Sequence, residues 1–247
     1  MLSGADCLGL CLAWTRTRGS AMVMQIIFGM TGTSASKYVR FGRQILIEVI
    51  KAEPLAAIKT PSFEMIRTFQ DIIRQKHPAL DGVWCCMDGL KLYLQQAGGA
   101  NTQHNLYNGW THDHYATLVF VICPDGTIPI CCYNLPGSIH DSLVTEWWNE
   151  SGQQHPDTNN HAEFAREFQI IKEATAMRQS AERGMRAIHS SFPHLKDCFV
   201  HKENGERKLV LKMMILLHNL CVRKVGINQI RNTFMPALNV NANRVYM

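Results

Sequence analysis

The spacing of apolar residues predicts helices through the first third of the chain. A first helix is expected from about residue 5, and a second spans 21–28. Ser34 is a plausible N-cap for a third helix over about 35–51. A connecting amphipathic helix is predicted over 62–76 because His77-Pro78 ends the pattern. In the third helix the apolar positions with helical spacing are Tyr38, Phe41, Ile45 and Val49.

From about residue 80 the pattern changes to that of strands. The run 83–87 is predicted as the first strand, and residues 90–95 either continue it or pair with it. The longest apolar run, 115–123, and the segment 127–133 are joined by Pro124-Asp125-Gly126, which is typical of a hairpin turn. Helical spacing returns in three later segments, at about 140–148, 162–190 and 208–225.

Two interpretations of the first helical segment stay open. Helix, turn and basic helix is the layout of a helix-turn-helix DNA reader, which would use the cations Lys37, Arg40 and Arg43 of the third helix. A plain helical bundle with a solvated basic face gives the same pattern. The pattern by itself does not separate them.

Composition narrows the class of protein. Of the 247 residues, 46% are apolar and 18% are charged, which indicates a globular chain long enough to bury a core. No run of about 20 apolar residues occurs, so no membrane span is expected. The net charge of +5 fits an acidic partner. Nine cysteines without CxxC spacing predict buried, reduced thiols of an intracellular protein in place of a zinc site.

Three acids stand out by position. Asp88 closes the apolar run 82–87, Asp141 follows the Pro136-Gly137-Ser138 turn, and Glu182 lies about 60° round a predicted helix from Met185. Carboxylates converging from strand, loop and helix can hold Mg²⁺ or Mn²⁺. Each acid also has a structural explanation, as a turn cap, as a first-turn helix acid, or as an i,i±4 partner of an arginine.

A series of motifs resembles the DDE-type endonucleases of Harbinger-like transposons. The resemblance covers about 82–235, and the helices at 21–51 resemble the helix-turn-helix segment that precedes the nuclease in that family. The Asp-Gly and Pro-Gly-Ser-x-His-Asp-Ser elements are quite specific together. The motifs, in order, are Cys86-Met87-Asp88-Gly89, Tyr107-Asn108-Gly109-Trp110, Pro136-Gly137-Ser138-Ile139-His140-Asp141-Ser142, Ala181-Glu182-Arg183-Gly184-Met185, Phe192-Pro193-His194-Leu195-Lys196 and Leu216-Leu217-His218-Asn219-Leu220.

The resemblance implies a fold, a reaction and a site. The fold is α/β, an RNase H-like nuclease domain with a mixed sheet and flanking helices. The reaction is phosphodiester hydrolysis or strand transfer by two divalent metal ions, Mg²⁺ or Mn²⁺, held by Asp88, Asp141 and Glu182. The implied partner is DNA, with a separate DNA-binding accessory protein as a further partner. The implied location is the nucleus, and neither a membrane nor a small-molecule cofactor is expected.

The sequence departs from the family between Asp141 and Glu182. In the family a further strand ends there in an acid that belongs to the working set. Here the interval holds no apolar strand ending in Asp, and Asp157 is a poor substitute. One central strand is therefore expected to be missing, which would leave an unpaired sheet edge. The alternative function is a catalytically dead DNA-binding or protein-interaction remnant, and a chain that never folds stably is the third possibility.

The expected organisation has four parts. Residues 1–55 form a helical, helix-turn-helix-like DNA-binding segment, and 56–80 form a connecting helix. Residues 81–236 form the endonuclease-like domain, and 237–247 are a tail.

Overall fold

The structure is a computed structural model of the whole chain. The predicted helix at 140–148 and the acids Asp141 and Asp157 lie outside the residues that it describes. The described residues are 2–17, 21–94, 106–137, 161–196, 204–226 and 230–234.

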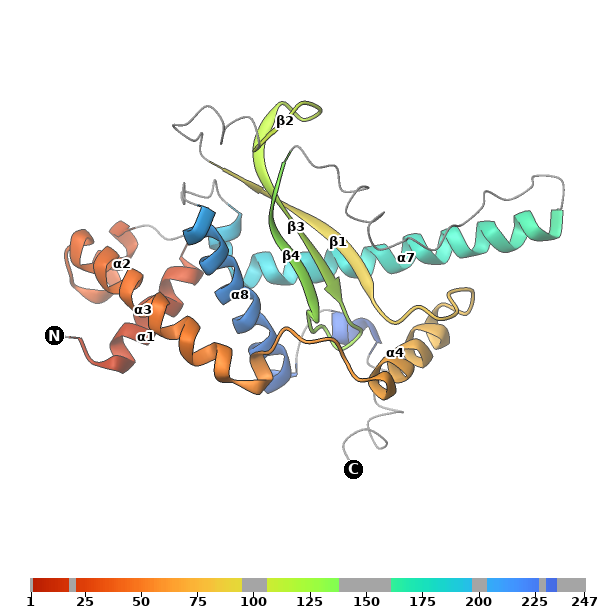
Figure 1. Cartoon of the computed structure of the whole chain (residues 1–247), viewed down its shortest axis with the longest axis horizontal. Helices are drawn as coiled ribbons and strands as arrows, with labels where there is room; N and C mark the ends of the chain where they lie inside the picture. Colours follow the sequence, from red (N-terminus) through yellow and green to blue (C-terminus); the bar gives the residue numbers. More distant parts are fainter. Residues whose placement is uncertain are drawn as a thin grey trace.

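The first third of the chain is helical, as predicted. The N-cap of the third helix is Thr31, whose Oγ1 accepts a hydrogen bond from the Ser34 backbone N–H at 3.3 Å. Ser34 is thus the third helical residue, and the expected N-cap was wrong by one turn. Gly29 takes a φ of +60° and ends the preceding helix, which leaves Thr31 in position to cap α3. The helices are α1 (Gly4–Arg16), α2 (Ala21–Phe28) and α3 (Gly32–Ala52), grouped at one end of the molecule (Figure 1).

The apolar stripe expected on α3 is largely exposed. Phe41, Ile45 and Val49 face solvent, and the buried side of the helix is the one that carries Val39 and Gly42. A Cβ atom at Gly42 would lie 2.5 Å from the Cys11 sulfur, so the two helices cross too closely for a side chain there. Contacts with α1 therefore decide which face of α3 is buried.

The connecting helix agrees closely with its prediction. A short 3-10 turn (η1, Pro54–Ala56) separates α3 from α4 (Phe63–Lys76). The Ser62 hydroxyl accepts from the Met65 backbone N–H at 3.3 Å, which satisfies one free donor of the first turn of α4. Phe69, Ile72 and Ile73 form the buried face.

A small antiparallel sheet follows, with its longest strand in the middle. β3 (Asp113–Ile122) pairs with β1 (Cys86–Tyr93) along one side. On its other side it pairs with β2 (Tyr107–Asn108) and β4 (Ile130–Pro136). All these pairings are antiparallel, so no parallel strand of the expected mixed sheet occurs in the described part of the chain. β1 begins three residues later than predicted and continues to Tyr93, which puts Asp88 inside the strand.

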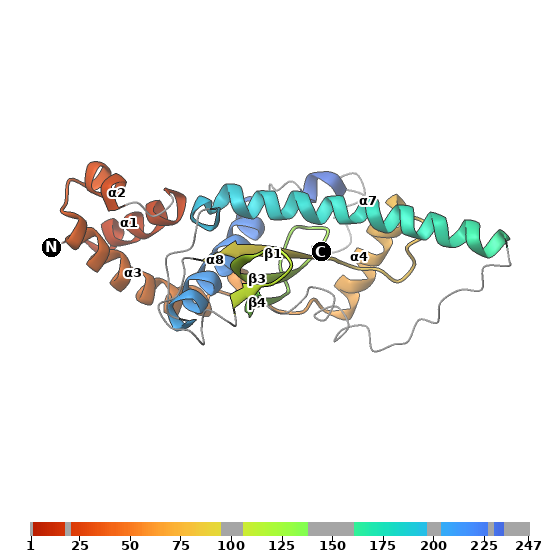
Figure 2. The ribbon, with the colours of Figure 1, turned by 90° about the horizontal axis from the view of Figure 1, so that it is seen from above.

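Two long helices pack on the sheet. α7 (His161–Ser191) runs along it and extends well past its end, and α8 (Asn204–Val225) crosses beside it (Figures 1 and 2). A 3-10 turn, η2 (Pro193–Leu195), follows α7. One face of the sheet forms a common core with the buried sides of both helices; the residues include Leu90, Leu92, Leu118, Phe120, Met177, Ala181, Met185, Ile188, Leu211 and Met214.

The C-terminal third of α8 fixes the hairpin between β3 and β4. Asn219 is fully buried; its Oδ1 accepts from the Ile128 backbone N–H at 2.8 Å, and its Nδ2 donates to the Ile128 carbonyl at 2.9 Å. Next to it, His218 Nε2 lies 3.1 Å from the Gly126 carbonyl, and burial lowers the pKa of this imidazole. His218 is therefore a hydrogen-bonded residue of the core.

The described chain is therefore an α/β structure with a small antiparallel sheet and flanking helices. Within the described ranges, no helix is both long and apolar enough to cross a bilayer.

Candidate nuclease centre and nucleic-acid interface

Asp88 lies in β1 on the face of the sheet that is covered by helices. Side chains alternate along a strand, so Asp88 shares its face with Cys86, Leu90 and Leu92. The Leu94 N–H donates to the His114 carbonyl, and hydrogen-bonded pairs alternate in an antiparallel ladder. The N–H of Gly89 consequently points away from β3, and it donates to Asp88 Oδ1 at 2.9 Å.

The helix that carries Glu182 packs on the same face. A Cβ atom at Gly184 would lie 3.0 Å from Ile122 Cδ1, and Ile122 is paired with Cys86 in the ladder. Ala181 and Met185 are buried against the sheet, whereas Glu182 is exposed beside this buried stripe. The two predicted acids therefore lie on elements that pack against each other.

The third acid of the predicted site, Asp141, belongs to the residues that are not described. In the described ranges, no group of three or more His, Cys, Asp or Glu side chains is placed to hold a metal ion. Asp88 and Glu182 suit Mg²⁺ or Mn²⁺ in their chemistry, but they do not make a complete ligand set. The cysteine beside them adds none: burial raises the pKa of Cys86 to about 12, so its thiol stays protonated.

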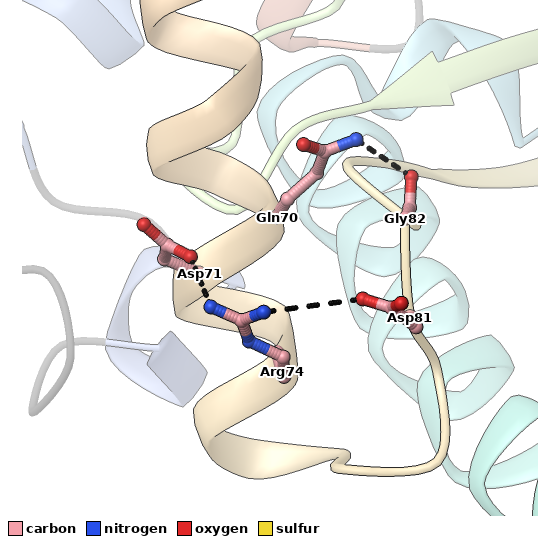
Figure 3. A network of polar contacts seen from close by, with 5 residues as sticks. All are labelled: Gln70, Asp71, Arg74, Asp81 and Gly82. Atoms are coloured by element: carbon pink, nitrogen blue, oxygen red, sulfur yellow. Dashed lines mark hydrogen bonds and ion pairs between the residues drawn. The ribbon is translucent and has the colours of Figure 1, made fainter.

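The entry to β1 is held by polar contacts from α4. Gln70 Nε2 donates to the Gly82 carbonyl at 2.9 Å, where Gly82 takes a φ of +76° (Figure 3). Arg74 reaches Asp71 at 2.7 Å and Asp81 at 4.0 Å. The Gln70 hydrogen bond fixes the turn that precedes the strand bearing Asp88, whereas the 4.0 Å contact of the exposed Asp81 with Arg74 contributes little.

β1 forms an edge of the described sheet. Of the strands that the structure describes, only β3 pairs with it. The sequence predicts an unpaired sheet edge because no strand ending in Asp is expected between Asp141 and Glu182. Residues 138–160 lie outside the described part of the chain, so the absence of that strand stays a prediction. At this edge the Asp88 carboxylate covers one outward-pointing donor, the Gly89 N–H.

The predicted cations of α3 divide between its two sides. Lys37 and Arg40 are exposed, and together with Ser36, Phe41 and Gln44 they line a surface hollow of about 480 Å³. Arg40 also forms an ion pair with Glu206 of α8 at 3.0 Å.

The third predicted cation, Arg43, is in the core. It is 7% exposed, and its guanidinium lies 4.6 Å from the centre of the Trp14 ring. Helical periodicity puts position 43 on the side of Ile47 and Ile50, which face the interior. In this conformation Arg43 is a structural cation, and a phosphate-binding surface on α3 would use Lys37 and Arg40.

Trp110 is an exposed aromatic residue. An aromatic side chain beside a strand is expected to pack on the sheet or, less often, to stack on a base, and Trp110 is 90% exposed in the turn between β2 and β3. The signal in the sequence is the dipeptide Asn108-Gly109, which marks a tight turn and so places the next residue at its tip.

Comparisons of the chain with protein-family models, with curated proteins and with solved structures find no match.

Proposed function

We propose that this chain is a transposase-derived, metal-dependent DNA endonuclease with an RNase H-like catalytic domain, acting in the nucleus. The observation that carries the proposal is the position of Asp88 within β1, on the face against which the Glu182-bearing helix packs. Asp88, Glu182 and Asp141 would hold the metal. When bound, such ions activate water and stabilise the leaving oxygen of a phosphodiester.

The contribution of the chain itself is positional. Gln70 fixes the start of β1, and β3 pairs with β1 along its full length. Together these contacts hold Asp88 in one orientation. The Gly89 N–H restrains the carboxylate further. A site built on rigid elements keeps its ligands close to the productive geometry, which supports a catalytic role better than a loop would.

The test is cleavage of supercoiled plasmid by the purified, folded protein. Nicking that requires Mg²⁺ or Mn²⁺, stops with a chelator and returns when the metal is restored is the expected result. A folded protein that leaves the plasmid intact with either metal would refute nuclease activity and leave the binding function described next.

A second function, DNA binding without cleavage, is favoured by a separate observation. The exposed cations Lys37 and Arg40 lie side by side on α3 around one hollow, next to the turn that joins α2 to α3. Such a surface can contact the phosphate backbone. It does not depend on the acids of the sheet, so binding would survive the loss of a metal ligand.

We expect the double substitution Lys37→Ala, Arg40→Ala to weaken binding to duplex DNA and to flatten its dependence on salt. Each phosphate contact contributes about 0.9 to the slope of log affinity against log salt concentration, so the slope should fall by about 2. Fluorescence anisotropy at several salt concentrations measures it. The matched control is Lys59→Ala, Arg67→Ala, which removes two exposed cations elsewhere. Equal losses in both double variants would show a general charge effect and no α3 site.

A further inference from the structure

The turn between β2 and β3 presents a tryptophan to solvent. Trp110 is 90% exposed, and the turn projects beyond the helices at one end of the sheet (Figure 1). Its neighbours in the turn, Gly109, Thr111 and His112, offer no large apolar side chain. A protein interface is usually centred on a contiguous apolar cluster, whereas the four residues of this turn offer one large aromatic ring, with the partly exposed Tyr107 beside it.

Side-chain hydrogen bonds hold the turn in one conformation. Asn108 Oδ1 accepts from the backbone N–H groups of Trp110 and Thr111, both at 3.0 Å, and from the Thr111 hydroxyl at 3.2 Å. The Tyr107 hydroxyl lies 3.1 Å from His112 Nδ1, where His112 takes a φ of +54°. The backbone under the indole is therefore fixed before any ligand arrives.

The same asparagine joins the turn to the segment that leads toward Asp141. Asn108 Nδ2 donates to the Gly137 carbonyl at 2.7 Å. A Cβ atom at Gly137 would lie against the carbonyl oxygens of Tyr115 and Leu106, so only glycine fits there. Four residues after Gly137 the chain reaches Asp141. The turn is thus held against Gly137, the last described residue of the Pro-Gly-Ser-x-His-Asp-Ser element, at the end of the sheet.

We propose that Trp110 is a stacking platform for an unpaired DNA base, an inference that rests on the proposed action on DNA. An indole accepts the flat face of any base, so the contact would not depend on sequence. Because Asn108 already orders the turn, binding would lose little conformational entropy. The platform would hold an unpaired nucleotide at the end of the sheet where the turn contacts Gly137.

The experiment measures binding of the full-length protein to fluorescein-labelled oligothymidylate by anisotropy. A length of about 16 nucleotides is used, the upper end of the range that one OB-fold domain covers on single-stranded DNA. Trp110→Ala is expected to weaken this binding by about 5- to 150-fold, the range for losing one stacked base. Trp110→Tyr, which keeps an aromatic face, is expected to restore most of the loss. Binding to duplex DNA without unpaired bases should change little.

The matched control is Phe63→Ala, which removes another isolated aromatic ring that is 87% exposed and lies outside the turn. It should leave oligothymidylate binding unchanged. If the wild type binds duplex DNA and Trp110→Ala leaves the affinity for oligothymidylate unaltered, this inference alone is overturned. A change of oligomeric state in Trp110→Ala with unaltered DNA affinity would overturn it in favour of a protein interface. If the wild-type chain binds neither duplex DNA nor oligothymidylate, the inference and the proposed function are overturned together.

Discussion

Replacing Asp88 by asparagine is expected to abolish metal-dependent cleavage of DNA and to leave DNA binding nearly intact. Asparagine keeps the shape of the side chain and an oxygen that can accept from the Gly89 N–H, so β1 should be preserved. What disappears is the negative charge that would hold the metal. Metal catalysis supplies several kcal/mol and about 1.4 kcal/mol is tenfold in rate, so we expect a loss of at least about 100-fold. Plasmid nicking measures it, with duplex binding in parallel.

The matched control for this variant is Asp81→Asn, seven residues earlier. Asp81 is an exposed acid in the turn before β1, and its contact with Arg74 is 4.0 Å long. Cleavage by this variant should equal that of the wild type. Glu182→Gln should resemble Asp88→Asn. An Asp88→Asn protein that cuts DNA at the wild-type rate would exclude Asp88 from the centre.

Asn219→Ala should lower the free energy of unfolding by about 3–5 kcal/mol. The side chain bonds both backbone groups of Ile128 and also donates to the Ala57 carbonyl at 3.3 Å. Its removal leaves backbone groups without partners, and each buried unsatisfied group destabilises the fold by about 1–3 kcal/mol. A domain of this kind is stable by about 5–15 kcal/mol, so a large share would be lost. Urea denaturation followed by circular dichroism gives the value.

Two further variants show whether hydrogen bonding is the cause. Cys221→Ala changes an exposed residue two positions along α8 and should stay within about 0.5 kcal/mol of the wild type. Asn219→Leu fills a similar volume without the hydrogen bonds and should be about as unstable as the alanine variant. A leucine variant as stable as the wild type would show that packing holds the β3–β4 hairpin and that the hydrogen bonds of Asn219 do not.

The helices and their order were predictable because their signals are local. The cap at Ser62, the break at His77-Pro78 and the glycine at 226 lie within a few residues of the helix ends they determine. The turn at Asp125-Gly126 is equally local, and Gly126 takes the positive φ of 87° that such a turn needs.

The buried face of α3 could not be predicted because distant segments determine it. The close approach of α1 at Gly42 turns Phe41 and Ile45 outward. The same contact places Arg43 against Trp14, although its charge indicated a surface position. Local sequence gives the helix but does not say which of two apolar stripes its neighbours will cover.

The candidate site could be predicted in part. The acids Asp88 and Glu182 follow from their motifs, and the packing of α7 on β1 gives that pairing a structural basis. The position of Asp88 within the strand was misjudged because the Asp88-Gly89 pair looks like a turn, whereas pairing with β3 carries the strand through it. The sequence leaves sheet packing and base stacking both open for Trp110, because its exposure depends on a turn four residues long that Asn108 closes.

The central claim is that Asp88 belongs to a divalent-metal site, and titration of Mn²⁺ into the folded protein by calorimetry tests it most directly. We predict saturable binding by the wild type that disappears in Asp88→Asn and persists in Asp81→Asn. No binding to a folded wild-type chain, or equal binding to Asp88→Asn, would contradict the claim.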